Sequence, residues 1–288
     1  MRRFIWLAPM TLLALLLVAG SIGAENQQWE ELFFRANEAY QEARFQEAVD
    51  GYSQLIRSGH ESGHLFYNLG NAYFRLNELG WAILNYERAR LLIPRDADLN
   101  FNVRYARDQM QDAVAETQGL MNTTFFWLDT FNLYELFWGF AVLNVVFWAI
   151  LVTRLFVRPD WIFYPLLIVL IVWFIAGLSF GLKWYQVYTD ERAVIVQEEI
   201  SVLAGPDIND TVLFKLHAGT EVCQERSEDG WSLVSLPDKK RGWVKKEAIE
   251  PIKRAHSPLL AAQATGNALA FADESSFGMR RHGGMAIL

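Results

Sequence analysis

The chain has 288 residues, 52% of them hydrophobic, and a formal net charge of −7 at neutral pH. This acidic balance argues against nucleic acid or another polyanion as a partner, because like charges repel. Its one cysteine, Cys223, excludes an internal disulfide, so the folded parts must be stable through their hydrophobic cores.

The N-terminal segment has the pattern of a secretory signal peptide. Arg2 and Arg3 precede an apolar run that ends at Ala19, and small residues follow. That order predicts an exported chain, with the signal peptide over residues 1–24 and cleavage after Ala24, although Ala19 and Ser21 also fit a cleavage site. If the segment stays uncleaved it becomes a third membrane helix, and the polar regions that follow remain outside the cytoplasm.

Residues 25–115 contain an internal repeat of 34 residues. Its small residues permit close approach of paired helices, and its aromatic residues fill the gaps between them. This pattern is similar to the tetratricopeptide repeat. The recurring residues of the clearest unit are Phe66, Leu69, Gly70, Tyr73, Ala82, Tyr86, Ala89 and Pro94.

A further amphipathic helix is expected after these repeats, where a third repeat would begin. Apolar residues recur there at intervals of three or four, and an aspartate, Asp96 or Asp98, marks its start. We interpret this helix as a cap on a short solenoid. Its apolar residues are Leu99, Val103, Ala106 and Met110.

The resemblance to tetratricopeptide repeats implies a concave face that binds peptides or protein surfaces. Basic residues that clamp a terminal carboxylate in some family members are replaced here by Asp98 and Asn102, so a folded surface or an uncapped segment is the expected ligand. The alternative is that the asparagines of this face only bond neighbouring groups. The candidate partner-binding residues are Phe33, Asn37, Tyr67, Asn68, Asn71, Arg75, Asn102 and Tyr105.

The sequence displays no catalytic constellation. His60 and His64 lie four residues apart, a spacing that can bring two imidazoles to one metal on a helix. They flank a turn without a cysteine, an aspartate or a third histidine nearby in sequence, so a solvated turn is favoured and no metal is expected. We expect neither a cofactor nor enzymatic activity, because no nucleophile motif or phosphate-binding loop accompanies them.

A linker is expected over residues 116–130 and a transmembrane hairpin over residues 131–184. Leu136–Thr153 is 18 residues without a charge, and Trp161–Leu182 is 22. About 20 apolar residues cross the roughly 30 Å hydrocarbon layer as a helix. The short turn between the two runs returns the chain to its starting side, so both polar regions share one compartment.

The hairpin turn carries Arg154 and Arg158, and arginines in short loops mark the cytoplasmic side. Both polar regions are therefore expected on the periplasmic or extracytoplasmic side of a bacterial inner (cytoplasmic) membrane. Within the spans, Asn144 is a polar residue near the middle, and Gly177 and Gly181 form a small face. Both features indicate helix association, inside the hairpin or with another membrane protein.

Residues 190–252 change to short alternating runs separated by turns, which predicts a β domain. Its motifs include Gly230-Trp231 and Gly242–Val244, and their order is similar to that of the bacterial SH3-like domain. Trp231 and Trp243 are candidate ligand-binding residues; the alternative, a place in the core, is favoured for Trp243. The predicted strands cover residues 193–196, 201–203, 211–216, 220–224, 231–236 and 242–244.

The remaining residues, 253–288, are rich in alanine, glycine and serine and are expected to be disordered. The expected fold class is thus a multidomain membrane protein: an all-α tetratricopeptide solenoid, a transmembrane helical hairpin and a small all-β SH3-like barrel. This order of modules resembles the BatE proteins of the Bacteroides aerotolerance group.

The resemblance implies a membrane-anchored extracytoplasmic scaffold for protein interactions. Its expected partners are Bat proteins with von Willebrand factor A domains, linked to a MoxR-type ATPase and to envelope or oxidative-stress tolerance, besides the lipid bilayer itself. The alternative is a cell-wall sensor that binds peptidoglycan through residues 190–252.

Overall fold

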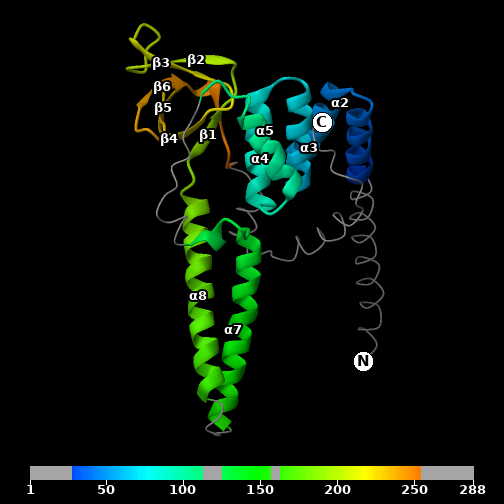
Figure 1. Ribbon diagram of the computed structural model, residues 1–288, viewed down its shortest axis with the longest axis vertical. Helices are drawn as coiled ribbons and strands as arrows, with labels where there is room; N and C mark the ends of the chain where they lie inside the picture. Colours follow the sequence, from blue (N-terminus) through cyan, green and yellow to red (C-terminus); the bar gives the residue numbers. More distant parts are fainter. Residues whose placement is uncertain (1–27, 113–124, 157–162, 254–288) are drawn as a thin grey trace, which may run out of the picture.

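The computed structural model describes residues 28–112, 125–156 and 163–253. The predicted signal peptide, most of the linker, most of the hairpin turn and nearly all of the predicted tail lie outside these ranges. Within them, the chain forms seven α-helices and one seven-stranded antiparallel sheet (Figure 1).

Five helices precede the membrane segment and form the helical region. Their short connections make neighbours antiparallel, so α3 packs between α2 and α4, and α5 packs on α4. Helix α5 begins at a cap in which the Asp96 carboxylate accepts from the Leu99 N–H at 2.8 Å, which confirms the predicted start. The helices cover residues 28–41, α2 Phe45–Arg57, α3 Gly63–Arg75, α4 Leu79–Leu92 and α5 Ala97–Arg107.

The sheet follows the membrane helices and has the order β3-β2-β6-β5-β4-β1-β7. All six predicted strands are confirmed. The seventh, β7, was not predicted: it has three residues and follows a single 3₁₀ turn, so it offers little alternation to detect. The strands are β1 Arg192–Ile195, β2 Glu199–Leu203, β3 Val212–His217, β4 Glu221–Glu228, β5 Trp231–Ser235, β6 Arg241–Lys245 and β7 Ile249–Pro251.

Strand β1 joins the two regions because both of its faces are buried. Val194 belongs to the core of the helical region, whereas Ala193 and Ile195 belong to the core of the sheet. This division follows from the strand's period of two. Ile252, just after β7, also lies in the helical core.

Helix α4 lies against β1 and is therefore buried around its circumference, from Ala82 to Ala89. Gly80 permits this contact, because a Cβ atom there would lie 2.5 Å from the Ile195 carbonyl oxygen. Helices with a single apolar face belong at a surface, whereas a helix buried all round belongs to an interior. Helix α4 is thus the middle layer between the other helices and the sheet.

Two long apolar helices lie between these regions in the sequence: α7, Leu133–Phe156, and α8, Phe163–Tyr188. Both are long and apolar enough to cross a membrane, with mean hydropathies of 2.1 and 2.5, and almost none of either apolar stretch is buried within the chain. They are consistent with a membrane anchor. The helical region and the sheet lie at the same end of this hairpin (Figure 1).

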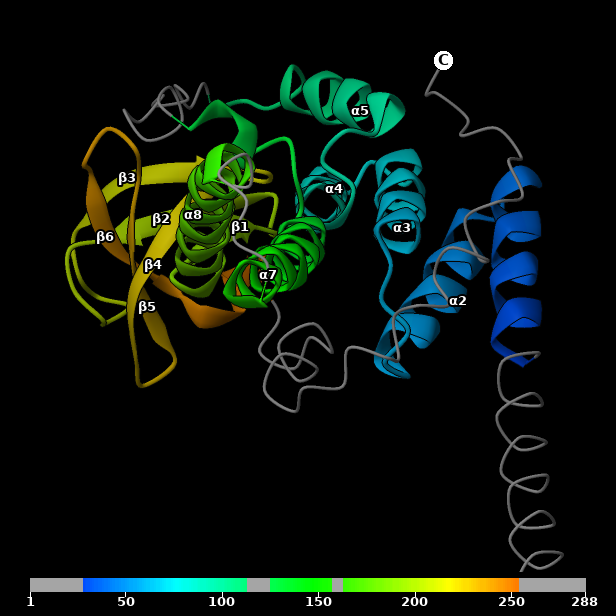
Figure 2. The same ribbon diagram turned by 90° about the horizontal axis from the view of Figure 1, so that it is seen from below.

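Each polar region is attached to one membrane helix. The Asn132 amide at the start of α7 donates to the Leu92 carbonyl at 2.9 Å, and Arg95 forms an ion pair with Glu135. Lys253, beyond β7, donates to the carbonyl of Tyr188 at the end of α8 at 2.7 Å. Seen from below, α8 overlies the sheet and α7 lies toward α4 (Figure 2).

The expected fold class of three separate modules is wrong. The structure shows N-terminal helices and a C-terminal sheet of seven strands, with no clear signal of a tetratricopeptide solenoid, and the helices share a core with the sheet instead of standing apart from it. The physical reason is that local sequence patterns predict helices and strands. They do not predict that α4 and β1 each bury a second face against the other.

Candidate functional site

Five of the eight predicted partner-binding residues are engaged in hydrogen bonds between helices. The Asn37 Oδ1 atom accepts from the Tyr52 hydroxyl at 2.7 Å and from the Asn68 amide at 3.2 Å. These bonds connect the first helix, α2 and α3. Burial raises the pKa of Tyr52, so its hydroxyl remains a donor at physiological pH.

The same arrangement recurs 34 residues later. The Asn71 Oδ1 atom accepts from the Tyr86 hydroxyl at 2.8 Å and from the Asn102 amide at 2.9 Å, and this amide also donates to the Tyr67 hydroxyl at 3.0 Å. Asn71 and Asn102 are buried. The internal repeat seen in the sequence therefore carries a repeated hydrogen-bond cluster that joins the helices, and these amides are already committed to it.

The other three predicted residues differ in exposure. Phe33 is half-buried, with its ring centroid 6.2 Å from that of Tyr52. Arg75 is exposed, and the Tyr105 side chain is 43% exposed. Arg75 and Tyr105 are therefore the two predicted residues best placed to meet a partner. Whether any of the eight binds a partner stays a prediction.

Arg75 and Tyr105 belong to two groups of contacting side chains that meet at the neighbouring residues Phe74 and Arg75, and we call the two groups together the aromatic band. The Arg75 guanidinium lies 5.0 Å above the centre of the Phe45 ring. Phe74, its neighbour in sequence, lies with its ring centroid 5.7 Å from that of Tyr105, which is in turn nearly parallel to Phe101 at 6.3 Å. The band consists of Tyr40, Phe45, Phe74, Arg75, Phe101 and Tyr105.

Phe74 and Phe101 were not predicted from the sequence as partner-binding residues. Phe101 and Tyr105 are four residues apart, a spacing that places both on one face of α5, away from the buried residues Leu99 and Val103. The signal that could have identified Phe101 is an aromatic pair that lies off the apolar face of an amphipathic helix. Aromatic residues and arginine are the residue types enriched at protein interfaces.

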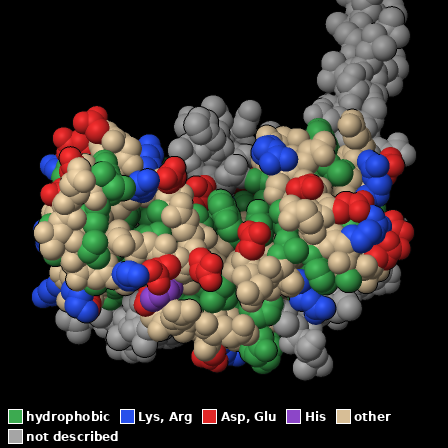
Figure 3. Space-filling view, turned by 90° about the horizontal axis from the view of Figure 1, so that it is seen from above, with side chains coloured by type: hydrophobic (Ala, Val, Ile, Leu, Met, Phe, Trp, Pro, Cys, Tyr) green, Lys and Arg blue, Asp and Glu red, His purple; other side chains and the backbone are tan. Residues whose placement is uncertain are grey.

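The face turned away from the membrane hairpin has no field of a single sign. Acidic and basic side chains are interspersed with hydrophobic ones (Figure 3). Mixed charge of this kind suits a protein partner better than a polyanion, which would require a basic patch.

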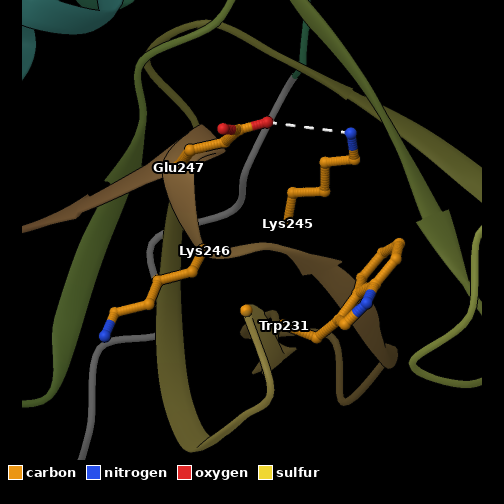
Figure 4. Close-up of a pocket in the computed structure, with 5 residues that line it drawn as sticks. Trp231, Lys245, Lys246 and Glu247 are labelled. Carbon is orange, nitrogen blue, oxygen red and sulfur yellow. Dashed lines mark ion pairs between the residues drawn. The ribbon is translucent and has the colours of Figure 1, made fainter.

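A second surface lies at the β4–β5 turn of the sheet. Gly230, Trp231, Lys245, Lys246 and Glu247 line an open hollow of about 440 Å³. Trp231 and Lys246 lie on opposite sides of it, and the Lys245–Glu247 ion pair, at 3.7 Å, crosses its rim (Figure 4). The hollow thus combines the Trp231 ring with two cations, Lys245 and Lys246, and one anion, Glu247.

Trp243 does not line this hollow. Its side chain is only 7% exposed, and the Arg226 guanidinium lies 5.1 Å above its ring centre. On the neighbouring strand Trp243 is opposite Leu233, whereas Trp231 is opposite Lys245. Of the two tryptophans, only Trp231 is therefore placed to contact a ligand in the hollow.

A buried charge network connects the helical region to the sheet. The Glu87 carboxylate on α4 is 2% exposed and accepts from Arg107 of α5 at 3.0 Å. Arg107 also donates to Glu221 of β4, and Arg192 of β1 lies 3.5 Å from Glu221 and 3.9 Å from Glu87. Burial and the negative charge of Glu221 raise the pKa of Glu87, which the arginines oppose.

Arg88, next to Glu87, holds the unpredicted strand β7. Its guanidinium donates to the Pro251 and Ile252 carbonyls at 2.8 and 3.1 Å and pairs with Glu250 at 3.2 Å. These bonds tie the end of the sheet to α4. The aromatic band and the hollow are therefore carried by two regions in a fixed relation.

A second contact between the regions involves Asp112, beyond α5. Its carboxylate accepts from the His217 backbone N–H and the Thr220 hydroxyl, both at 2.7 Å, and lies 2.9 Å from His217 Nδ1. His217 Nε2 lies 3.6 Å from Glu199, which also pairs with Lys215. We call this cluster the aspartate–histidine latch.

The contacts of the latch shift the pKa values of both His217 and Asp112. The hydrogen bond to Asp112, aided by Glu199, raises the pKa of His217. Partial burial acts to raise the pKa of Asp112, but the hydrogen bonds from Thr220 and His217 outweigh it and lower that pKa. Among the residues that the structure describes, no group of three or more histidine, cysteine, aspartate or glutamate side chains is arranged to hold a metal.

No protein-family model matches the chain, and no curated protein is significantly similar to it.

The latch predicts a pH dependence with a definite sign. Protonated His217 stabilises the contact below its ordinary pKa of about 6.5, and this contribution is lost as the pH rises through the raised value. The Asp112 contribution is lost as the pH falls through its lowered pKa. In histidine-labelled protein, NMR should place the His217 midpoint above about 6.5, and Asp112→Asn should lower it.

The matched control for this titration is Glu228→Gln, since Glu228 is an exposed carboxylate on β4 that pairs with Arg226 instead. This variant should leave the His217 midpoint unchanged. An unchanged midpoint in Asp112→Asn would show that the latch does not set the protonation of His217.

Proposed function

We propose that this protein is a non-catalytic, membrane-anchored scaffold that binds another protein through the aromatic band outside the cytoplasm. The observation that carries the proposal is the band itself. Tyr105 and Phe101 are 43% and 44% exposed, although they belong to a helix whose apolar face is already buried against α4. Exposed aromatic residues gathered beside an arginine are typical of interface hot spots.

The attachment to the hairpin supports the scaffold role. A membrane anchor confines its bound partner near the bilayer and so raises the partner's local concentration. The compartment is the extracytoplasmic side, because arginines lie at the hairpin turn and the N-terminal segment has the pattern of a signal peptide. The membrane is then a bacterial inner membrane, with both polar regions in the periplasm or its equivalent.

The proposed partners are Bat-type proteins with von Willebrand factor A domains, within an envelope or oxidative-stress-tolerance complex. This assignment depends only on the sequence resemblance to the BatE proteins, because the structure does not have the three separate modules that the resemblance implies. The mixed charge of the outer face and the overall negative charge also favour a protein over a polyanion.

Crosslinking and affinity capture from native membranes would test the scaffold. The double variant Phe101→Ala, Tyr105→Ala removes the exposed end of the band without touching the asparagine clusters. It should reduce recovery of proteins with von Willebrand factor A domains about tenfold or more, since hot-spot aromatics each contribute a large share of binding. Phe34→Ala is the matched control, because Phe34 is 59% exposed and lies outside the band.

Equal recovery from the double variant and the control would show that the band is not the contact. Failure to recover any protein with a von Willebrand factor A domain from the unaltered chain would contradict the proposed partners but not the band. Circular dichroism of each purified variant checks that the fold is retained.

A second candidate function is cell-wall binding through the hollow at Trp231. The specific observation is that the hollow offers a tryptophan ring beside one anion and two cations. Peptide stems of the cell wall carry both carboxylates and amines, which Lys245, Lys246 and Glu247 could pair with, while the ring covers an apolar portion.

Sedimentation of the full-length protein with purified cell wall tests this candidate. The full chain is needed because the helical region shares a core with the sheet. Trp231→Ala should reduce binding about tenfold, whereas Leu213→Ala, a change at a 50% exposed residue of the same sheet outside the hollow, should not. Equal binding by both variants would exclude the hollow as the site.

A further inference from the structure

One polar side chain lies near the middle of the membrane helices. Eleven residues of α7 precede Asn144 and twelve follow it. Among the described residues, no group donates to this amide or accepts from it. Thr153, nearer the end of the same helix, behaves differently, because its hydroxyl donates to the Ala149 carbonyl at 2.7 Å.

Hydrocarbon cannot hydrogen-bond the free amide, so a partner inside the bilayer is favoured. Helix α8 offers one group at this depth. Trp173 lies between Phe140 and Phe147, with ring centroids 5.8 and 5.2 Å away, and its Nε1–H is buried without an acceptor. Even if this N–H turned to the Asn144 oxygen, the two N–H groups of the amide would remain without an acceptor.

Asn144 is the centre of a stripe along α7 with the spacing of a helix-packing seam. Residues at intervals of four and three share one side of a helix and pack into a second helix. The ring of Phe137 lies 5.8 Å from that of Phe180 on α8, whereas Trp148 is 53% exposed, so α8 leaves the Trp148 part of the stripe uncovered. The stripe consists of Phe137, Ala141, Asn144, Trp148 and Leu151.

We propose that this stripe binds the same stripe of a second copy of the chain, with the two Asn144 amides paired across a two-fold axis. A primary amide carries both donors and an acceptor, so two copies satisfy each other reciprocally. A different membrane protein would have to supply its own polar group at this depth, whereas a second copy supplies it by construction. A single polar residue in an apolar seam also fixes its register.

This contact is independent of the scaffold proposal, because it lies in the membrane spans and not on the aromatic band. Oxidative crosslinking of the full-length protein in native membranes tests it. The chain's one cysteine is first removed as Cys223→Ser, and a reporter cysteine is then placed in the stripe as Trp148→Cys. Val146→Cys is the matched control, since Val146 is 40% exposed on the opposite side of α7.

The expected result is a disulfide-linked dimer with Trp148→Cys and little with Val146→Cys. Adding Asn144→Leu should weaken the association about 5- to 30-fold, whereas Asn144→Gln, which keeps the amide, should retain most of it. The leucine is more apolar than asparagine, so membrane insertion is not impaired.

Three outcomes would overturn the proposal. One is equal dimer yield at both reporter positions, which would indicate random collision. Another is an undiminished dimer in the Asn144→Leu variant. The last is crosslinking of Trp148→Cys to a different membrane protein with no dimer, which would assign the stripe to that protein.

Discussion

The buried carboxylate of Glu87 is the constraint on which the rest of the structure depends. A charge with 2% of its surface exposed is stable only with partners. Arg90 on the same helix is one of them, at 2.9 Å, and two more come from elements distant in sequence, Arg107 on α5 and Arg192 on β1. Glu221 on β4 then balances the arginines. Two pairs of this network join the regions, Arg107 with Glu221 and Arg192 with Glu87, so separating the helical region from the sheet would break both.

This constraint explains how the two surfaces are held. The aromatic band belongs to the helices and the hollow at Trp231 belongs to the sheet, yet α4 and β1 join the two regions through one core and one charge network. Each region is also attached to one helix of the membrane hairpin. The scaffold role that we propose would benefit from this rigidity, because a partner that binds a fixed surface loses less freedom on binding.

Much of the local structure could be predicted from the sequence. Two long apolar helices and six strands were predicted from apolar runs and from alternation, and of the two aspartates expected at the start of α5, Asp96 or Asp98, Asp96 is the cap. These features depend on neighbouring residues, which a sequence displays directly. The 34-residue repeat was also detectable, and its asparagines recur in equivalent hydrogen-bond clusters.

What the sequence did not reveal depends on contacts between distant residues. Strand β7 is too short to show a pattern, and Arg88 holds it from 162 or more residues away. The predicted fold class was wrong because the outer face of α4 carries polar and apolar residues, as an exposed helix face does. The sequence does not show that this face is buried. The asparagines were predicted to bind a partner or, alternatively, to bond neighbouring groups, but their bonds to Tyr52 and Tyr86 form only when the helices pack.

The most direct test of this account is amide hydrogen exchange of the full-length protein in bilayer discs, comparing the unaltered chain with Glu87→Ala. If the charge network joins the regions, exchange should accelerate about tenfold or more in α4 and also in β1, Arg192–Ile195, on the far side of the interface. Acceleration in α4 alone, with β1 unchanged, would show that the helical region and the sheet are independent and would contradict the account.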